Sequence, residues 1–177
     1  MFPPLPSWDA AHPIIVHIPI GILMVAPLFL VASMLPWRHA GIMAIVTLAL
    51  MVIGTTGAAL AVASGEEAGE AAESVASAEA VLEEHEEAGE LSRNLFIGLT
   101  IFYAALVALP RVWKRASEHK VHAAISGVFL ILNVLALGQL ANTGHLGGRL
   151  VHEFGVHAPI TKEAPAPAAS NVEMDDE

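Results

Sequence analysis

The amino-acid sequence predicts an all-α integral membrane protein: a four-transmembrane-helix bundle with both termini outside and a helical, acidic extracytoplasmic insert between helices two and three. Three observations predict this fold. The chain of 177 residues is 55% hydrophobic, above the ~45–50% that is usual in soluble domains. Its apolar residues are gathered in four blocks, and a helix of about 20 apolar residues crosses a bilayer. Basic residues are concentrated in two short loops, which orients the spans.

Composition excludes several kinds of site and partner. The chain has no cysteine, so disulfides, thiolate zinc sites, cysteine-ligated iron–sulfur clusters and covalent c-type haem attachment are excluded. The formal net charge of −10 argues against a nucleic-acid partner, because phosphate binding needs a basic surface. The N-terminus lacks the pattern of a cleavable signal peptide, since no Lys or Arg precedes Arg38.

The first span is predicted at about 13–35, in a run that holds three prolines. Pro13 suits the first helical turn, where its missing N–H costs nothing. The residue before it, His12, is then expected outside the helical conformation. Pro19 falls inside the helix and removes one backbone hydrogen bond, so we expect a kink near His17.

The other three spans are predicted at about 41–63, 94–110 and 121–141. The second span carries Gly54 and Gly57 near its middle, which either allow close helix packing or leave room for a flat ligand. Few polar groups lie inside the spans, so a continuous proton or ion path is not favoured.

Between the second and third spans, residues 64–93 contain ten glutamates. The segment consists mainly of Ala and Glu, which are good helix formers but provide little apolar surface. This composition predicts a solvated helix or a helical hairpin, broken near residues 74–77. The acidic face formed by Glu66 to Glu90 either keeps this insert solvated or attracts a basic soluble electron carrier; a membrane-bound electron-transfer partner on the outer face is the other partner considered. The remaining segments are an N-terminal outer segment at 1–12 with Trp8 as an interfacial anchor, a four-helix membrane domain at 13–159 that ends in a Gly- and His-rich re-entrant segment at 142–159, and a disordered acidic tail at 160–177.

Charge predicts the orientation of the bundle. Five of the eight basic residues fall in the two loops on one side, and seventeen of the eighteen acidic residues fall on the other side. The positive-inside rule therefore places both termini and the acidic insert outside a bacterial inner membrane.

This topology gathers several histidines at the outer end: His12, His17, His85, His145 and His152. His12 and His17 are five residues apart, so on one helix their directions would differ by roughly 140°. His145 and His152 would share a face, but the intervening Gly147 and Gly148 indicate either a helix break or a close backbone approach.

Without thiolates, two kinds of cofactor site remain: haem b with two axial imidazoles, and a histidine site for zinc, copper or non-haem iron. We predict a b-type cytochrome-like subunit that holds haem near the outer membrane face for electron transfer. His17 and His85 are the first ligand pair to consider, with His12 and His145 as alternates and His152 as an accessory residue. No catalytic residue is predicted, and a non-catalytic subunit is favoured over a stand-alone enzyme.

The alternative is a non-haem metal-binding or purely structural membrane subunit with no catalytic activity of its own. In that case His12, His145 and His152 bind zinc, copper or iron, or donate hydrogen bonds at the helix ends.

Three stretches of sequence resemble a bacterial membrane family known as domain of unknown function 2231: HPIIVHIPIGILMVAPLF from His12, HEEAGELSRN from His85, and TGHLGGRLVHEFGVHAP from Thr143. The resemblance covers Pro6 to about Pro159 and implies the four-helix membrane fold. His152 stands where the family has Tyr, and glutamates replace a Gly-Asp pair after the second span. The last stretch is similar to relatives fused to cytochrome c domains, which implies redox chemistry. The family's motif positions fall on His12, Pro13, His17, Pro19, His85, Gly147, Gly148, Leu150, Val151, Gly155 and Val156.

Overall fold

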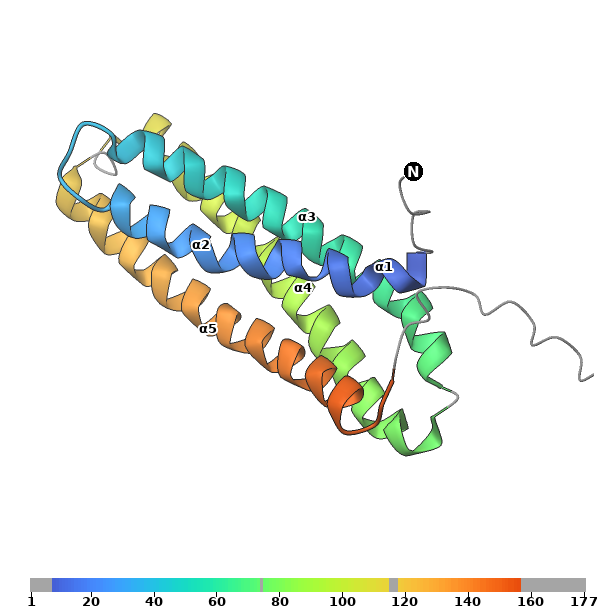
Figure 1. Cartoon of the computed structure of the whole chain (residues 1–177). Coiled ribbons are helices and arrows are strands. Elements are labelled where there is room, and N and C mark those ends of the chain that lie inside the picture. Colours follow the sequence, from blue (N-terminus) through green and yellow to red (C-terminus); the bar gives the residue numbers. More distant parts are fainter. Residues whose placement is uncertain (1–7, 74, 115–117, 157–177) are drawn as a thin grey trace, which may run out of the picture.

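The protein is an elongated bundle of long helices (Figure 1). A computed structural model describes residues 8–73, 75–114 and 118–156; the predicted tail at 160–177 and the first seven residues lie outside this range. The elements in chain order are α1 (Trp8–Ile15), α2 (His17–Ser33), α3 (Ala40–Ala72), the 3-10 helix η1 (Ala76–Ala78), α4 (Glu79–Ala108), the 3-10 helix η2 (Leu109–Arg111) and α5 (His119–His152).

Four stretches are long and apolar enough to cross a membrane: Ala10–Ser33, Ala40–Gly69, Ala76–Arg111 and His119–His152. Large apolar side chains are exposed along these stretches, among them Leu28, Ile101 and Leu135, each about two-thirds exposed. A soluble protein rarely exposes so much apolar surface, whereas a bilayer accepts it. The predicted all-helical membrane bundle with four spans is therefore confirmed.

The start of the chain differs from its prediction. The helix begins at Trp8 and runs through His12 and Pro13, so His12 is helical and the segment 1–12 is not wholly outside the helix. The reason is packing, because α1 lies against α3. The break falls at Val16, one residue before His17, near the predicted kink. There the His17 ring donates to the Pro13 carbonyl through Nδ1.

The end of the membrane domain also differs. We expected a re-entrant segment at 142–159 and a possible break at Gly147 and Gly148, but α5 continues unbroken to His152. A glycine costs about 1 kcal/mol in a helix, and tertiary contacts of this segment outweigh that cost. In the acidic region, α3 runs on to Ala72 and α4 begins at Glu79, so residues 64–93 form a helical hairpin that prolongs the two membrane helices.

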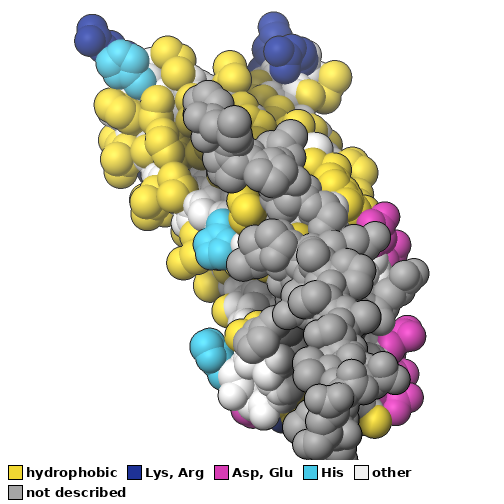
Figure 2. Space-filling model, turned by 45° about the vertical axis from the view of Figure 1, so that its right-hand side comes forward, with side chains coloured by type: hydrophobic (Ala, Val, Ile, Leu, Met, Phe, Trp, Pro, Cys, Tyr) yellow, Lys and Arg dark blue, Asp and Glu magenta, His cyan; other side chains and the backbone are white. Residues whose placement is uncertain are grey.

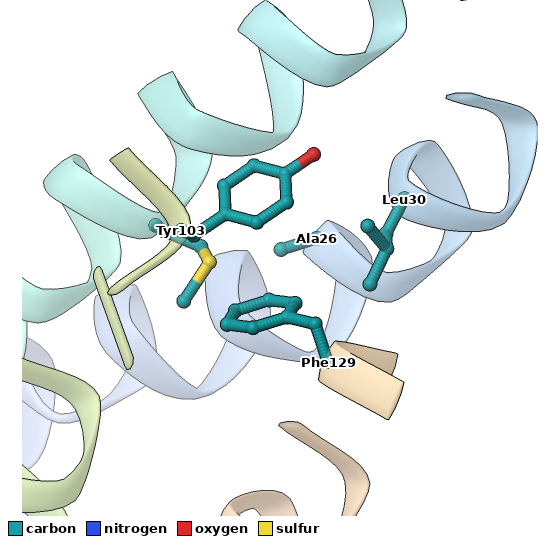
Figure 3. Packing of buried hydrophobic residues seen from close by; sticks show 5 residues of the cluster. Ala26, Leu30, Tyr103 and Phe129 are labelled. Carbon is teal, nitrogen blue, oxygen red and sulfur yellow. The ribbon is translucent and has the colours of Figure 1, made fainter. Parts of the chain in front are cut away.

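The middle of the bundle is closely packed. Ala26, Leu30, Met51, Tyr103 and Phe129 form a buried cluster (Figure 3) in which the rings of Tyr103 and Phe129 are 4.7 Å apart. Gly54 lies against Leu23 and Gly57 against Pro19, where an added Cβ would come within 2.6 Å and 3.2 Å of side-chain carbons. These two glycines therefore serve helix packing, and the idea that they make room for a flat ligand is wrong.

Candidate functional site

A cavity of about 780 Å³ lies at the acidic end of the bundle, between the second half of α1, the first residues of α2, the late part of α3, the early part of α4 and the late part of α5. Its size falls within the ~300–1,000 Å³ of typical small-molecule sites. Its wall is mainly apolar side chains and glycine. Four histidines line it: His12, His17, His85 and His152.

His12 enters the cavity from α1 and is held by α3. Its Nδ1 lies 3.0 Å from the Ser64 hydroxyl, which itself donates to the Ala61 carbonyl. The serine oxygen is thus left to accept, so His12 donates through Nδ1. The imidazole packs on Gly65, where a Cβ would lie 3.1 Å from the ring Cε1. Only glycine lets the ring approach α3 this closely.

His85 enters the same cavity from α4 and is held by α5. Its Nδ1 donates to the Thr143 carbonyl over 3.0 Å. A carbonyl can only accept, so Nδ1 carries a proton. The ring packs on Gly147, where a Cβ would lie 3.0 Å from Cε1. The Thr143 hydroxyl in turn bonds to the Ala88 carbonyl and to Ser92, each over 2.9 Å, which fixes the two helices around the ring.

His12 and His85 thus share one arrangement. Each ring lies on a glycine of the neighbouring helix and donates through Nδ1 to a protein oxygen. In the hydrogen bonds of these rings to Ser64 and Thr143, both rings use Nδ1 and neither uses Nε2. Both imidazoles line the same cavity. A histidine that ligates a metal almost always donates its other ring N–H to a carbonyl or similar acceptor, which fixes the tautomer and aims the remaining nitrogen.

The other predicted site residues are placed differently. His17 is exposed at the wall of the cavity, and His152 is exposed at its edge near the end of α5. His145 is exposed and does not line the cavity. The structure therefore brings together four of the five predicted histidines. Of these, His12 and His85 are half-buried and held across helices, whereas the first pair predicted was His17 with His85.

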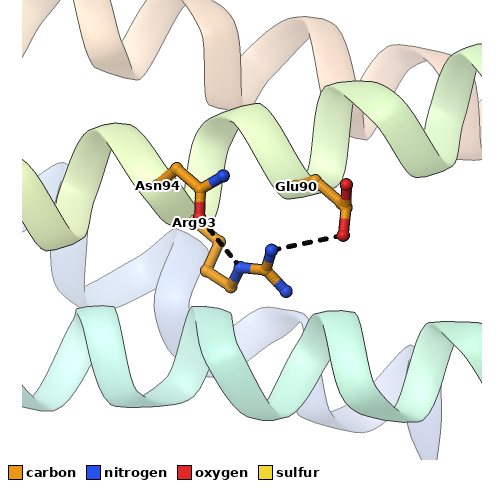
Figure 4. Close-up of polar contacts among 3 residues, drawn as sticks. All are labelled: Glu90, Arg93 and Asn94. Atoms are coloured by element: carbon orange, nitrogen blue, oxygen red, sulfur yellow. Dashed lines mark hydrogen bonds and ion pairs between the residues drawn. The ribbon is translucent and has the colours of Figure 1, made fainter.

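Glutamates surround the mouth of the cavity. Five line it: Glu66, Glu83, Glu86, Glu87 and Glu90. Arg93 also lines it, and its guanidinium is held by Glu90 and by the Asn94 side-chain oxygen, each over 3.2 Å (Figure 4). Acidic side chains extend along the same half of the molecule, while basic side chains gather at the opposite end (Figure 2). The mouth of the cavity is therefore strongly negative.

Sequence reasoning missed the residues that support the two rings: Ser64, Gly65 and Thr143. The doubled glycine at 147–148 was a usable signal, since it suggested close backbone approach. Gly147 makes that approach, to His85, while a Cβ on Gly148 would meet nothing within 4 Å.

Four helices long and apolar enough to cross a membrane, with a cavity lined by His12, His17, His85 and His152 at their acidic end, define the class of the protein, a helical integral membrane protein. The family described as "Predicted membrane protein (DUF2231)" matches residues 9–159, so the chain belongs to that family. This confirms the resemblance noted from the three sequence stretches. No curated protein and no solved structure matches the chain.

Proposed function

We propose that the protein is a b-type cytochrome-like membrane subunit that binds haem b between His12 and His85 and serves electron transfer. One observation carries the proposal: two imidazoles from different helices line one apolar cavity, and each donates through Nδ1 to a protein oxygen. That leaves Nε2 of both rings as the atoms able to bind iron.

The donor set suits haem rather than a bare metal ion. Haem supplies one-electron redox chemistry at its iron, and its ring is flat and apolar, as the cavity wall requires. Among the described residues, no group of three or more His, Asp or Glu side chains is placed to hold a metal ion. A zinc or copper site with three protein ligands therefore has less support than a pair of axial imidazoles.

The chain's own residues set how such a site works. Ser64 and the Thr143 carbonyl hold the two rings, so His12 and His85 would both hold the iron of a bound haem and would leave no free position for oxygen. This favours electron transfer over oxygen chemistry. The glutamates at the mouth stabilise the more positive, oxidised state of a redox centre, and they attract a basic soluble electron carrier to the same end.

The non-haem alternative rests on His12, His145 and His152. These three do not converge, because His145 is exposed outside the cavity lining. A structural or assembly role without any cofactor is the other alternative, and the same experiment distinguishes all three.

The test is a reduced-minus-oxidised optical spectrum of the full chain, purified after expression with ample haem, together with a pyridine haemochrome assay and elemental analysis. Haem b near one per chain is expected. Stoichiometric zinc or copper without a Soret band would establish the non-haem alternative, and neither haem nor metal would leave the structural role.

The proposal includes an orientation, with the acidic end outside the bacterial inner membrane. Because the chain lacks cysteine, Ser77→Cys at the acidic end and Lys114→Cys at the basic end can be labelled individually in intact cells. An impermeant thiol reagent is expected to reach residue 77 only. Labelling of residue 114 alone would reverse the orientation.

A further inference from the structure

A second cavity, of about 620 Å³, lies at the opposite, basic end of the bundle. It is bounded by the residues that join α2 to α3, by the end of α4 with η2, and by the first turns of α5. Four side chains that carry or accept positive charge line it: Arg38, Arg111, His119 and His122. The described residues of its lining include no Asp or Glu. Its electrostatic character is thus opposite to that of the histidine cavity.

A buried hydroxyl also lines this cavity without a partner. Tyr103 is 2% exposed, and its hydroxyl has no hydrogen bond to any described residue. The hydroxyls of Ser33 and Thr47 face it and donate to the carbonyls of Leu30 and Met43 over 2.6 Å and 2.9 Å, so neither supplies a proton to the Tyr103 oxygen, and neither lies in hydrogen-bond geometry with it. An unsatisfied buried hydroxyl carries an uncompensated desolvation cost. An acceptor oxygen brought into the cavity would remove that cost.

The surroundings indicate where such an oxygen comes from. Both arginines are exposed at the end of the apolar spans, where headgroups lie. Arg38 uses Nε to bond His39 over 3.2 Å, which leaves its terminal N–H groups. Leu35, Trp37 and Val112 beside the cavity are exposed and apolar, the last at 85%. Basic pockets between membrane helices commonly bind phosphorylated headgroups, because guanidinium groups pair with phosphate oxygens.

We propose that this cavity binds the phosphate group of an anionic phospholipid, with Arg38 and Arg111 pairing the phosphate and Tyr103 donating to an ester or phosphate oxygen. The acyl chains then lie on the exposed apolar surface beside Leu35 and Val112. Inorganic phosphate shares the recognised group, so the experiment separates the two sources. The inference does not depend on haem binding at the other end.

Trp37 lines the cavity and serves as the reporter. In a Trp8→Phe/Trp113→Phe background, Trp37 is the only tryptophan of the chain. Its fluorescence is measured in the full chain in detergent, titrated with brominated phosphatidylglycerol, brominated phosphatidylcholine or inorganic phosphate. We expect half-maximal quenching by phosphatidylglycerol at a concentration roughly tenfold lower than for phosphatidylcholine, the ratio expected of one charge-assisted contact. Equal quenching by both lipids would mean that only annular lipid binds, and would overturn the proposal.

Competition between inorganic phosphate and phosphatidylglycerol shows which molecule supplies the bound phosphate group. If inorganic phosphate shifts the quenching curve of phosphatidylglycerol, the site recognises the phosphate group itself, whichever molecule carries it. If phosphate has no effect while the preference for phosphatidylglycerol persists, the acyl chains are required and the ligand is the lipid.

Matched variants test the assigned residues. Arg38→Gln/Arg111→Gln is expected to weaken phosphatidylglycerol binding by at least about tenfold. Lys114→Gln/Lys120→Gln removes the same charge at the same end, from residues outside the cavity lining, and is expected to change binding by less than about twofold. Equal losses in the two pairs would reduce the effect to general surface charge and contradict the site.

Tyr103→Phe removes only the hydroxyl and keeps the buried ring. About a fivefold loss of phosphatidylglycerol binding is expected, equivalent to one neutral hydrogen bond. Thermal unfolding of the variant without lipid provides the control for folding. Its unfolding temperature is expected to equal or exceed that of the wild type, because the unsatisfied hydroxyl is gone. Unchanged binding would exclude Tyr103 from the site.

Discussion

The two ends of the bundle use the same four helices for opposite chemistry. At the acidic end, His12 and His85 donate through Nδ1 to protein oxygens, which leaves the lone pairs on Nε2 of both rings. At the basic end, Tyr103 and two arginines leave N–H and O–H donors for an anion. The acidic cavity therefore presents nitrogen lone pairs that can bind a metal, and the basic cavity presents N–H and O–H groups that can donate hydrogen bonds. The ligand that each cavity suits therefore depends on which donors and acceptors the protein's own hydrogen bonds leave unused.

The packed middle of the bundle keeps the two cavities apart, so disturbing it is expected to have the largest effect. An alanine Cβ at Gly54 would lie 2.6 Å from Leu23. Gly54→Ala is expected to destabilise the bundle by about 1–3 kcal/mol, measured by thermal or denaturant unfolding in detergent. Gly98→Ala, on α4 with nothing within 4 Å, is the control and is expected to be neutral or slightly stabilising. Equal effects of both variants would contradict the packing described here.

Ser64→Ala tests the acidic end alone. Without the serine oxygen, the His12 ring loses the acceptor that fixes its tautomer, and changes of this kind typically cost 10–100-fold in affinity for a bound metal group. Haem retention is expected to fall by about that factor, while quenching of Trp37 by phosphatidylglycerol stays unchanged. Loss of both signals would show general unfolding instead.

Gly147→Ala sharpens the same comparison. A Cβ there would lie 3.0 Å from Cε1 of His85, so the ring must shift although alanine favours the helix. Haem affinity is expected to drop roughly tenfold, about 1–1.5 kcal/mol. Gly138→Ala, on the same helix with nothing within 4 Å, is expected to retain full affinity. If both variants bind haem like the wild type, His85 is not a ligand.

The smallest expected effect comes from the acidic mouth. Glu86→Gln removes a negative charge from the lining, so the midpoint potential of the haem is expected to rise by roughly 10–30 mV at low salt. Glu84→Gln makes the same change on the same helix outside the lining and is expected to shift the potential less. An equal shift in both variants would mean that only net charge matters.

The same acidic face predicts salt-dependent association with a basic soluble electron carrier. Binding of a cationic c-type cytochrome, used as a probe, is expected to weaken as ionic strength rises. Binding that is independent of salt would exclude electrostatic docking.

The sequence allowed the four membrane-length helices to be predicted, because a bilayer imposes length and hydropathy on each helix. The helical hairpin near Ala72 and Glu79 and the break beside His17 also followed from local composition and proline. The pairing of histidines did not follow. The hydrogen bond from His12 to Ser64 joins residues 52 positions apart, and that from His85 to Thr143 joins residues 58 positions apart. Such contacts depend on how each helix is rotated about its axis, and no local sequence pattern fixes that rotation.

The glycines also show that the sequence does not reveal which residues are in contact. Gly54, Gly57, Gly65 and Gly147 each meet a neighbouring side chain, whereas a Cβ on Gly148 would meet nothing within 4 Å. In sequence they look alike. Only the packed partner separates a glycine that makes room for another helix from one that makes room for an imidazole.

The central claim is that His12 and His85 together hold the iron. Electron paramagnetic resonance of the oxidised, haem-loaded protein tests it most directly. Wild type and His145→Ala are expected to give a low-spin ferric signal, because both axial imidazoles are present. His12→Ala and His85→Ala are each expected to lose that signal, giving high-spin haem or no haem. A low-spin signal that survives in either variant, or that disappears in His17→Ala while His12→Ala keeps it, would contradict the account.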